Sequence, residues 1–165
     1  MKLSMRKCLL IVCFLPFFIS SASAAVVPFP ELCASGTPAQ IRAAILDGAD
    51  IVERNSEGVT PLMFAAAGNP DPLAASELLD AGASLTERDY AGLTPLMWAA
   101  ARNEEPQVSA LLLQRGAEVN ARSRDGVTPL LFAAGNNENP EIASLLLKAG
   151  ADKDAKNRSG WSAVM

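Results

Sequence analysis

A repeat of 34 residues is the feature that most constrains the fold of this 165-residue chain. The tripeptide Thr-Pro-Leu occurs at residues 60–62, 94–96 and 128–130. Three further columns share that spacing: Gly58, Gly92, Gly126 and Gly160; Gly48-Ala49, Gly82-Ala83, Gly116-Ala117 and Gly150-Ala151; and Pro38, Pro72, Pro106 and Pro140. Several independent sequence motifs that recur with the same period predict a stack of similar units, each covering an apolar face of the next.

Each unit is predicted to contain two helices. Thr60 can cap the first helix through its hydroxyl, and Pro61 then occupies the first helical position, where a missing N–H costs nothing. A similar pair starts the second helix: Thr37-Pro38, Asp71-Pro72, Asn139-Pro140 and, in a weaker form, Glu105-Pro106. Paired leucines give that helix its apolar stripe, and the glycine of each Gly-Ala pair ends it in the left-handed conformation.

The segment 58–66, Gly-Val-Thr-Pro-Leu-Met-Phe-Ala-Ala, and its copies at 92–100 and 126–134 resemble the signature of ankyrin repeats. The resemblance extends from about residue 28 to residue 165. It implies an all-α solenoid of helix-turn-helix pairs joined by β-hairpin turns. The histidine usual in the family is replaced by Met63, Met97 or Leu131, so we expect apolar contact in place of its hydrogen bonds.

The first 24 residues have the pattern of a signal peptide. Lys2, Arg6 and Lys7 precede an apolar run over 9–19, and the small residues 22–24 predict cleavage before Ala25. An uncleaved membrane anchor is the alternative, although the run is shorter than the roughly 20 residues that span a bilayer. We expect an exported, bacterial-type protein that is periplasmic or secreted; in a eukaryotic secretory route, residues 157–159 would form a glycosylation sequon.

These features divide the chain into six parts. We expect a signal peptide over 1–24, an atypical N-terminal capping repeat over 25–57, ankyrin repeats over 58–91, 92–125 and 126–159, and an incomplete repeat over 160–165. The last part stops where its first helix should begin. We therefore expect the C-terminal end to fray, to form a homodimer, or to continue in a longer protein.

Composition argues against several kinds of function. The leader holds three of the 14 basic residues and none of the 18 acidic ones, so a chain beginning at Ala25 carries a net charge of −7 and is a poor candidate to bind nucleic acid. The chain has no histidine, which excludes histidine-based catalysis and metal sites. Residues 152–154 resemble the start of a calcium loop, but Lys156 and Asn157 are unsuitable in the positions that follow. We expect no catalysis, no metal, no cofactor and, after cleavage, no membrane attachment.

Three other features each allow two interpretations. Cys33 aligns with Ala66, Ala100 and Ala134, which favours a packed thiol over an intermolecular disulfide. The aromatic column Phe64, Trp98 and Phe132 is more typical of framework than of a binding stripe. The basic column is attributed to solvated hairpin charges that pair with acids such as Glu53 or Asp89: Arg54, Arg88, Arg122 and Lys156.

Members of the family bind partners mainly through hairpin tips and the adjoining surface of the first helices, so the resemblance implies a protein-binding scaffold. The matching positions change from repeat to repeat while the framework stays constant. The predicted contact residues are Ser56, Glu57, Val59, Tyr90, Ala91, Leu93, Arg102, Arg124, Asp125, Val127 and Arg158. We expect Tyr90 to be the anchor, because tyrosine, tryptophan and arginine dominate binding hot spots.

Two other functions remain open at this stage. The chain could be an accessory subunit of an enzyme, or it could act in assembly by associating with itself through its C-terminal face. The missing catalytic residues argue against catalysis by the chain itself. The residues do not identify the partner.

Overall fold

The computed structural model describes residues 27–163, which form helix pairs connected by turns. Within this range the helices are α1 (Phe29–Ser35), α2 (Pro38–Leu46), α3 (Pro61–Gly68), α4 (Pro72–Asp80), α5 (Pro95–Arg102), α6 (Pro106–Gln114), α7 (Pro129–Asn136) and α8 (Pro140–Lys148). No strand occurs in the described range, where Lys156 and Ser162 form one isolated antiparallel bridge. The predicted all-α class is confirmed, and the predicted signal peptide lies outside the described residues.

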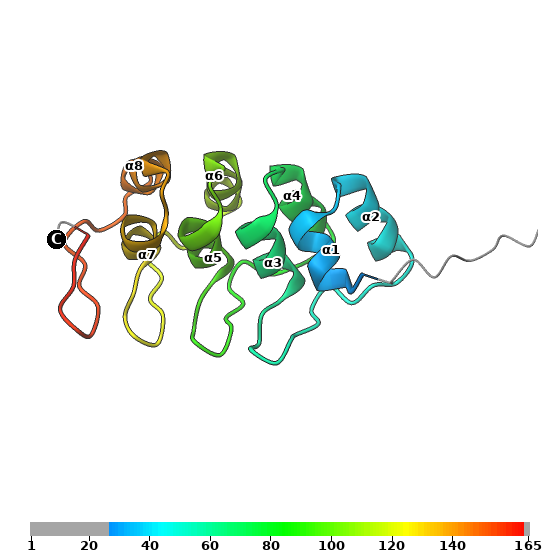
Figure 1. Ribbon diagram of the computed structural model, residues 1–165, viewed down its shortest axis with the longest axis horizontal. Helices are drawn as coiled ribbons and strands as arrows, with labels where there is room; N and C mark the ends of the chain where they lie inside the picture. Colours follow the sequence, from blue (N-terminus) through cyan, green and yellow to red (C-terminus); the bar gives the residue numbers. More distant parts are fainter. Residues whose placement is uncertain (1–26, 164–165) are drawn as a thin grey trace, which may run out of the picture.

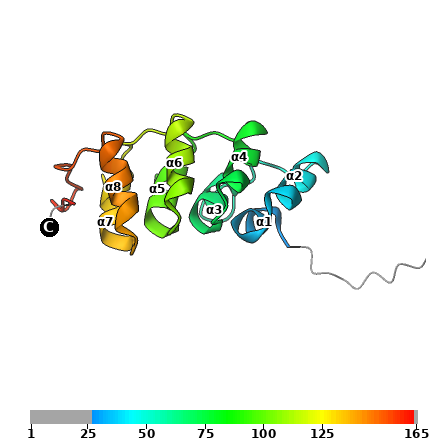
Figure 2. The ribbon, with the colours of Figure 1, turned by 90° about the horizontal axis from the view of Figure 1, so that it is seen from above.

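The helices form two parallel rows (Figure 1). The first helices of the units, α1, α3, α5 and α7, pack against one another in one row, and α2, α4, α6 and α8 form the other. Figure 2, seen from above, shows the same order along the stack. The turns between units all project on the side of the first-helix row, so their tips and the first helices enclose an open angle.

Small residues in the first helices allow this close stacking. Ala65, Ala66, Ala99 and Ala100 are all at most 1% exposed. Larger apolar side chains fill the space between the two rows: Ile41, Leu62, Leu78, Leu96, Val108, Leu112, Ile142 and Leu146. Complete burial of one such aliphatic side chain contributes about 1.5–3 kcal/mol to stability, so the contacts between neighbouring units supply the core of the molecule.

The predicted helix ends are present, with two differences. The second helices of the units, α2, α4, α6 and α8, each end shortly before a glycine with positive φ, such as Gly82 at +104°. The Thr94 and Thr128 hydroxyls accept the N–H groups of Met97 and Leu131, both at 3.4 Å, but the Thr60 hydroxyl is buried without a hydrogen-bond partner, so the expectation that it caps α3 is wrong.

The second difference concerns the residues that replace the family's histidine. At the first helices, the Thr60 and Thr94 N–H groups donate to the sulfur atoms of Met63 and Met97, each at 3.5 Å. The expectation of purely apolar contact is therefore wrong for these methionines, because thioether sulfur is a weak hydrogen-bond acceptor.

An asparagine column connects the units at the end of each first helix. The Asn103 Nδ2 donates to the carbonyl oxygens of Ala66 and Asn69 in the preceding unit, at 2.9 and 2.8 Å, and its Oδ1 accepts the N–H of Glu105 at 2.9 Å. Equivalent bonds are formed by Asn69 and Asn137. These asparagines have the same 34-residue spacing as the predicted framework, so the sequence contained a signal for them.

The basic column connects the units on the side of the turns. The Arg88 guanidinium donates to the carbonyl oxygens of Gly92 at 2.9 Å and of Arg122 in the next unit at 2.7 Å. Arg54 and Arg122 repeat this arrangement, and Arg54 also pairs with Glu87. As expected, these side chains are exposed to solvent, and Arg54 pairs with a nearby acid. The acids named in the expectation, Glu53 and Asp89, are wrong, because the guanidinium groups bond mainly to the backbone of two successive turns.

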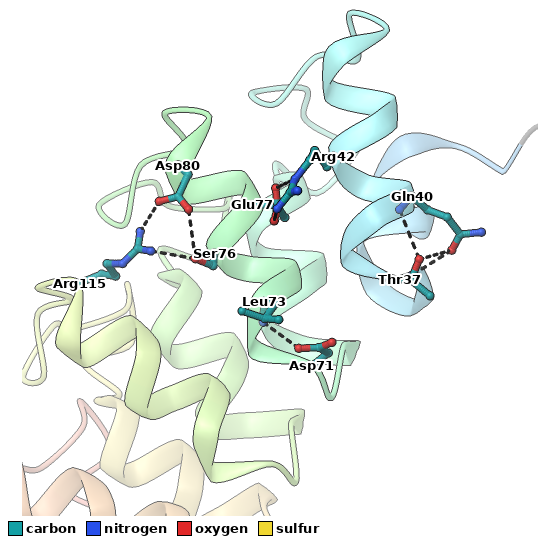
Figure 3. A network of polar contacts seen from close by, with 9 residues as sticks. All are labelled: Thr37, Gln40, Arg42, Asp71, Leu73, Ser76, Glu77, Asp80 and Arg115. Carbon is teal, nitrogen blue, oxygen red and sulfur yellow. Dashed lines mark hydrogen bonds and ion pairs between the residues drawn. The ribbon is translucent and has the colours of Figure 1, made fainter.

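Polar contacts also connect the exposed faces of the second helices (Figure 3). Arg42 pairs with Glu77, and Arg115 pairs with Asp80 at 2.9 Å while donating to the Ser76 hydroxyl at 2.8 Å. The hydrogen bond from Arg42 lowers the pKa of the Glu77 carboxyl and raises that of the guanidinium. Solvent screens such exposed pairs, so they add little to stability.

We predict that Asn103→Ala destabilises the chain strongly. The side chain is 5% exposed, and its loss leaves two carbonyls and one N–H without their partner. We expect the free energy of unfolding, measured by urea titration, to fall by about 2–3 kcal/mol. Asn136→Ala is the matched control at an exposed position one residue before the homologous Asn137, and should change it by less than about 0.5 kcal/mol. Equal effects of the two substitutions would contradict the role of the asparagine column.

Candidate protein-binding surface

Internal hydrogen bonds hold each hairpin tip in a fixed shape. The Asn55 Oδ1 accepts the N–H groups of Glu57 and Val59, both at 2.9 Å. Asp89 and Asn157 accept the equivalent pair of N–H groups in their own tips. Ser123 accepts only the second of the pair, the N–H of Val127. Successive tips are also joined through the backbone: Tyr90 N–H to Glu57 O, Arg124 N–H to Ala91 O, and Arg158 N–H to Asp125 O. The tips therefore present their side chains from a continuous, preorganised row.

Most of the predicted contact residues are exposed along this row. The exposed ones are Ser56, Glu57, Tyr90, Ala91, Arg102, Arg124, Asp125 and Arg158. Leu93 and Val127 are half-buried. Val59 is only 4% exposed, so the expectation that it is an exposed contact is wrong. Its side chain lies beneath the tip and lines a pocket together with Met63 and Phe64.

Tyr90 is held in place although it is 59% exposed. A Cβ atom on Gly58 would lie 2.7 Å from the Tyr90 Cδ1, so the ring lies directly against this glycine of the preceding tip. Gly58 also has a φ of +79°, a conformation that other residues rarely adopt. Gly58 thus leaves room for the ring, which presents its remaining surface to solvent.

A pocket of about 250 Å³ lies in the angle between the tip at residues 55–59 and the first helices. Phe64 and Ala67 of α3 and Trp98 and Arg102 of α5 contribute to its lining. The Trp98 indole donates to the Asp89 Oδ2 at 3.1 Å, and the Arg102 guanidinium lies 4.8 Å from the centre of the Trp98 ring. Trp98 therefore combines the two interpretations of the aromatic column, since it supports a hairpin and also lines a pocket.

Cys33 is a packed thiol in the described structure. It is fully buried, and burial raises its pKa from 9.0 to about 12. Ala66 and Ala100 of the same column are buried, but Ala134 is exposed. The alignment with Ala134 therefore does not indicate burial at every position, because among the described residues no further first helix packs on α7.

A second pocket, of about 410 Å³, lies at the C-terminal end of the described stack. It is lined by Leu131 and Phe132 of α7 and by Trp161, which is 63% exposed. Among residues 27–163 there is no group of three or more side chains suited to hold a metal ion. None of the helices over this range is long and apolar enough to cross a membrane.

Stacked helix pairs with a preorganised row of tips define an α-helical repeat solenoid. Family models described as ankyrin repeats, in three copies and in many copies, match residues 31–123 and 112–164. The chain belongs to the ankyrin-repeat family. Repeats of this family generally mediate protein–protein interaction. A comparison with curated proteins found no match to this chain.

We predict that Cys33 is protected from thiol reagents in the native protein. At pH 8 the buried thiol is protonated, so maleimide should modify it slowly in buffer and rapidly in urea, as measured by peptide mass spectrometry. Because folding raises the pKa, the stabilising contribution of the protonated thiol is present below pH 9 and is lost as the pH rises toward 12. Equally fast modification in buffer and in urea would contradict burial, and modification in urea only after addition of a reductant would favour a mixed or intermolecular disulfide.

Proposed function

We propose that this chain is an exported scaffold that binds another protein through its hairpin tips and the adjoining surface of its first helices. One observation carries the proposal: the tips are rigid and exposed, yet their residues differ from unit to unit. Successive tips present Ser56-Glu57, Tyr90-Ala91, Arg124-Asp125 and Arg158-Ser159. The framework beneath them repeats, so the variation has no role in stacking and is available for recognition.

Export to the periplasm or the medium is part of the proposal and depends on the leader pattern of residues 1–24. We predict that the protein isolated from its native source begins at Ala25, as measured by intact mass and N-terminal sequencing. Replacing Ala22 and Ala24 by bulky residues should block cleavage, because signal peptidase requires small side chains at these positions. A mature protein that retains Met1 would contradict cleavage and favour the membrane-anchor alternative.

Site-specific crosslinking tests the binding surface. A photo-crosslinking amino acid at Ala91, on an exposed tip, should give a product with a second protein in the native source. The same group at Gln114, exposed on α6, is the matched control and should give none. Products at both positions, or at neither, would contradict the proposed surface.

The predicted anchor can be tested in the same experiment. Tyr90→Ala should reduce the yield of the Ala91 product severalfold, since it removes the large ring exposed at the tip. It should change the free energy of unfolding by less than about 1 kcal/mol, as expected for a mostly exposed position. Tyr90→Phe keeps the ring against Gly58 and serves as the conservative control. An unchanged yield, or a large loss of stability, would exclude Tyr90 as the anchor.

A second candidate function is assembly, with this chain as an accessory subunit of an envelope enzyme or complex that self-associates through its C-terminal face. The pocket at Leu131, Phe132 and Trp161 favours it, because an apolar hollow beside an exposed tryptophan is typical of an interaction surface. A crosslinked product of twice the monomer mass, obtained from Trp161 and not from Ala91, would support this function over partner binding by the tips.

A further inference from the structure

The pocket beneath the first described tip, here called the Trp98 pocket, has a distinct chemical composition. It is defined by Asn55, Ser56, Glu57, Val59, Met63, Phe64, Ala67, Trp98 and Arg102. Val59 and Met63 are buried at its base, while Phe64 and Trp98 are half-buried in its walls. With a volume of about 250 Å³, it can receive a few side chains of a partner but not a folded element.

The walls of the Trp98 pocket are fixed before any partner arrives. The tip is held by the two bonds to Asn55, and the indole of Trp98 is held by its bond to Asp89. Arg102, one helical turn after Trp98, stacks over that indole. A preformed pocket loses little conformational entropy on binding, which favours affinity for a small contact area.

Arg102 differs from five other arginines of the stack, whose side chains bond within it, and resembles Arg124 and Arg158 at the exposed tips, whose side chains form no ion pair among the described residues. Arg54, Arg88 and Arg122 use their guanidinium groups to bond backbone carbonyls, and Arg42 and Arg115 pair with carboxylates. Within the described part of the chain, Arg102 stacks on Trp98 but forms no ion pair and donates no hydrogen bond. Stacking leaves the N–H groups at the edge of the guanidinium plane available, in the geometry that binds a carboxylate through two hydrogen bonds.

The repeat supports a specific rather than a structural role for Arg102. The homologous positions one period away are Gly68 and Asn136, so stacking of the units does not require a cation there. Trp98 is likewise replaced by Phe64 and Phe132, which lack an indole N–H. The combination of a fixed indole and a stacked guanidinium therefore occurs once among the three full repeats.

We propose that the Trp98 pocket receives an apolar side chain of the protein partner, and that an acidic side chain of the same partner segment pairs with Arg102. This inference rests on the proposed function, since it names the chemistry of the partner at one part of that surface. The apolar side chain contacts Phe64, Ala67 and Trp98. The carboxylate binds at Arg102 of α5, and the negative charge of Glu57, which also lines the pocket, disfavours a carboxylate beside the tip.

Peptide selection tests the proposal and does not require the partner to be identified. A random twelve-residue library displayed at the N-terminus of a phage coat protein is selected on the purified protein and on Arg102→Glu. Display in this form leaves no free peptide carboxyl terminus, so any carboxylate selected belongs to an Asp or Glu side chain. We expect the first selection to enrich an acidic residue near a large apolar one, and the second to enrich Lys or Arg in place of the acid.

The selected acidic peptide then provides a quantitative probe. By fluorescence anisotropy, Arg102→Gln should weaken its binding by about ten- to a hundredfold, the range expected for loss of a charged hydrogen bond. Arg115→Gln, at an exposed arginine that follows α6 outside the pocket, is the matched control and should leave the affinity unchanged. Circular dichroism of each variant checks that the fold is retained.

The outcomes separate this inference from the proposed function. Peptides without an acid, peptides insensitive to Arg102→Gln, or no enriched peptide at all would overturn the role of the Trp98 pocket. If the crosslink at Ala91 persists in that case, binding by the tips stands and only the assigned chemistry is wrong. Loss of both results would contradict the proposed function as well.

Discussion

No unit of this chain can bury its own apolar face, and this constraint determines the rest of the structure. A pair of helices of seven to nine residues is too short to enclose a core, so α1, α3 and α5 are each covered by the first helix of the next unit. Alanine makes this contact close, and Ala66 and Ala100 are completely buried by it. Ala134 has the same place in its repeat but is exposed. Burial is therefore a property of the neighbouring unit as much as of the residue.

Apolar contact between flat helical faces is not directional, so other interactions must fix the register of the units. The asparagine column does this at one edge of the stack and the arginine column at the other. The side chains of both columns donate to backbone carbonyls of a neighbouring unit. These carbonyls recur at equivalent positions because the units have the same backbone conformation. The tips are thereby held at constant spacing. A surface whose backbone is fixed in this way can vary its side chains freely, which is the property that a binding scaffold needs.

Local features of the fold could be predicted from the sequence, and contacts between units could not. The Thr-Pro helix starts and the left-handed glycines depend on the conformational preferences of single residues, and the structure contains both. The bonds of Arg88 depend on where the next turn lies, which only stacking determines. The expectation that Val59 is exposed is wrong for the same reason, since its side chain lies beneath the tip and lines the pocket with Met63 and Phe64 of α3. The asparagine column shares the period, but spacing alone does not reveal which atoms a side chain reaches.

Residues that differ from their equivalents in the other repeats can be assigned a function other than stacking. A residue present in all three full repeats, such as Thr94 or Asn103, is explained by the bonds it makes within the stack. Arg102 stands where the neighbouring repeats have glycine and asparagine, and its side chain makes no polar bond within the described stack. It lies over Trp98, whose position is phenylalanine in those repeats. Neither residue is needed for the solenoid to form, since the adjacent repeats stack without them. We therefore propose that these two residues serve the binding of a partner.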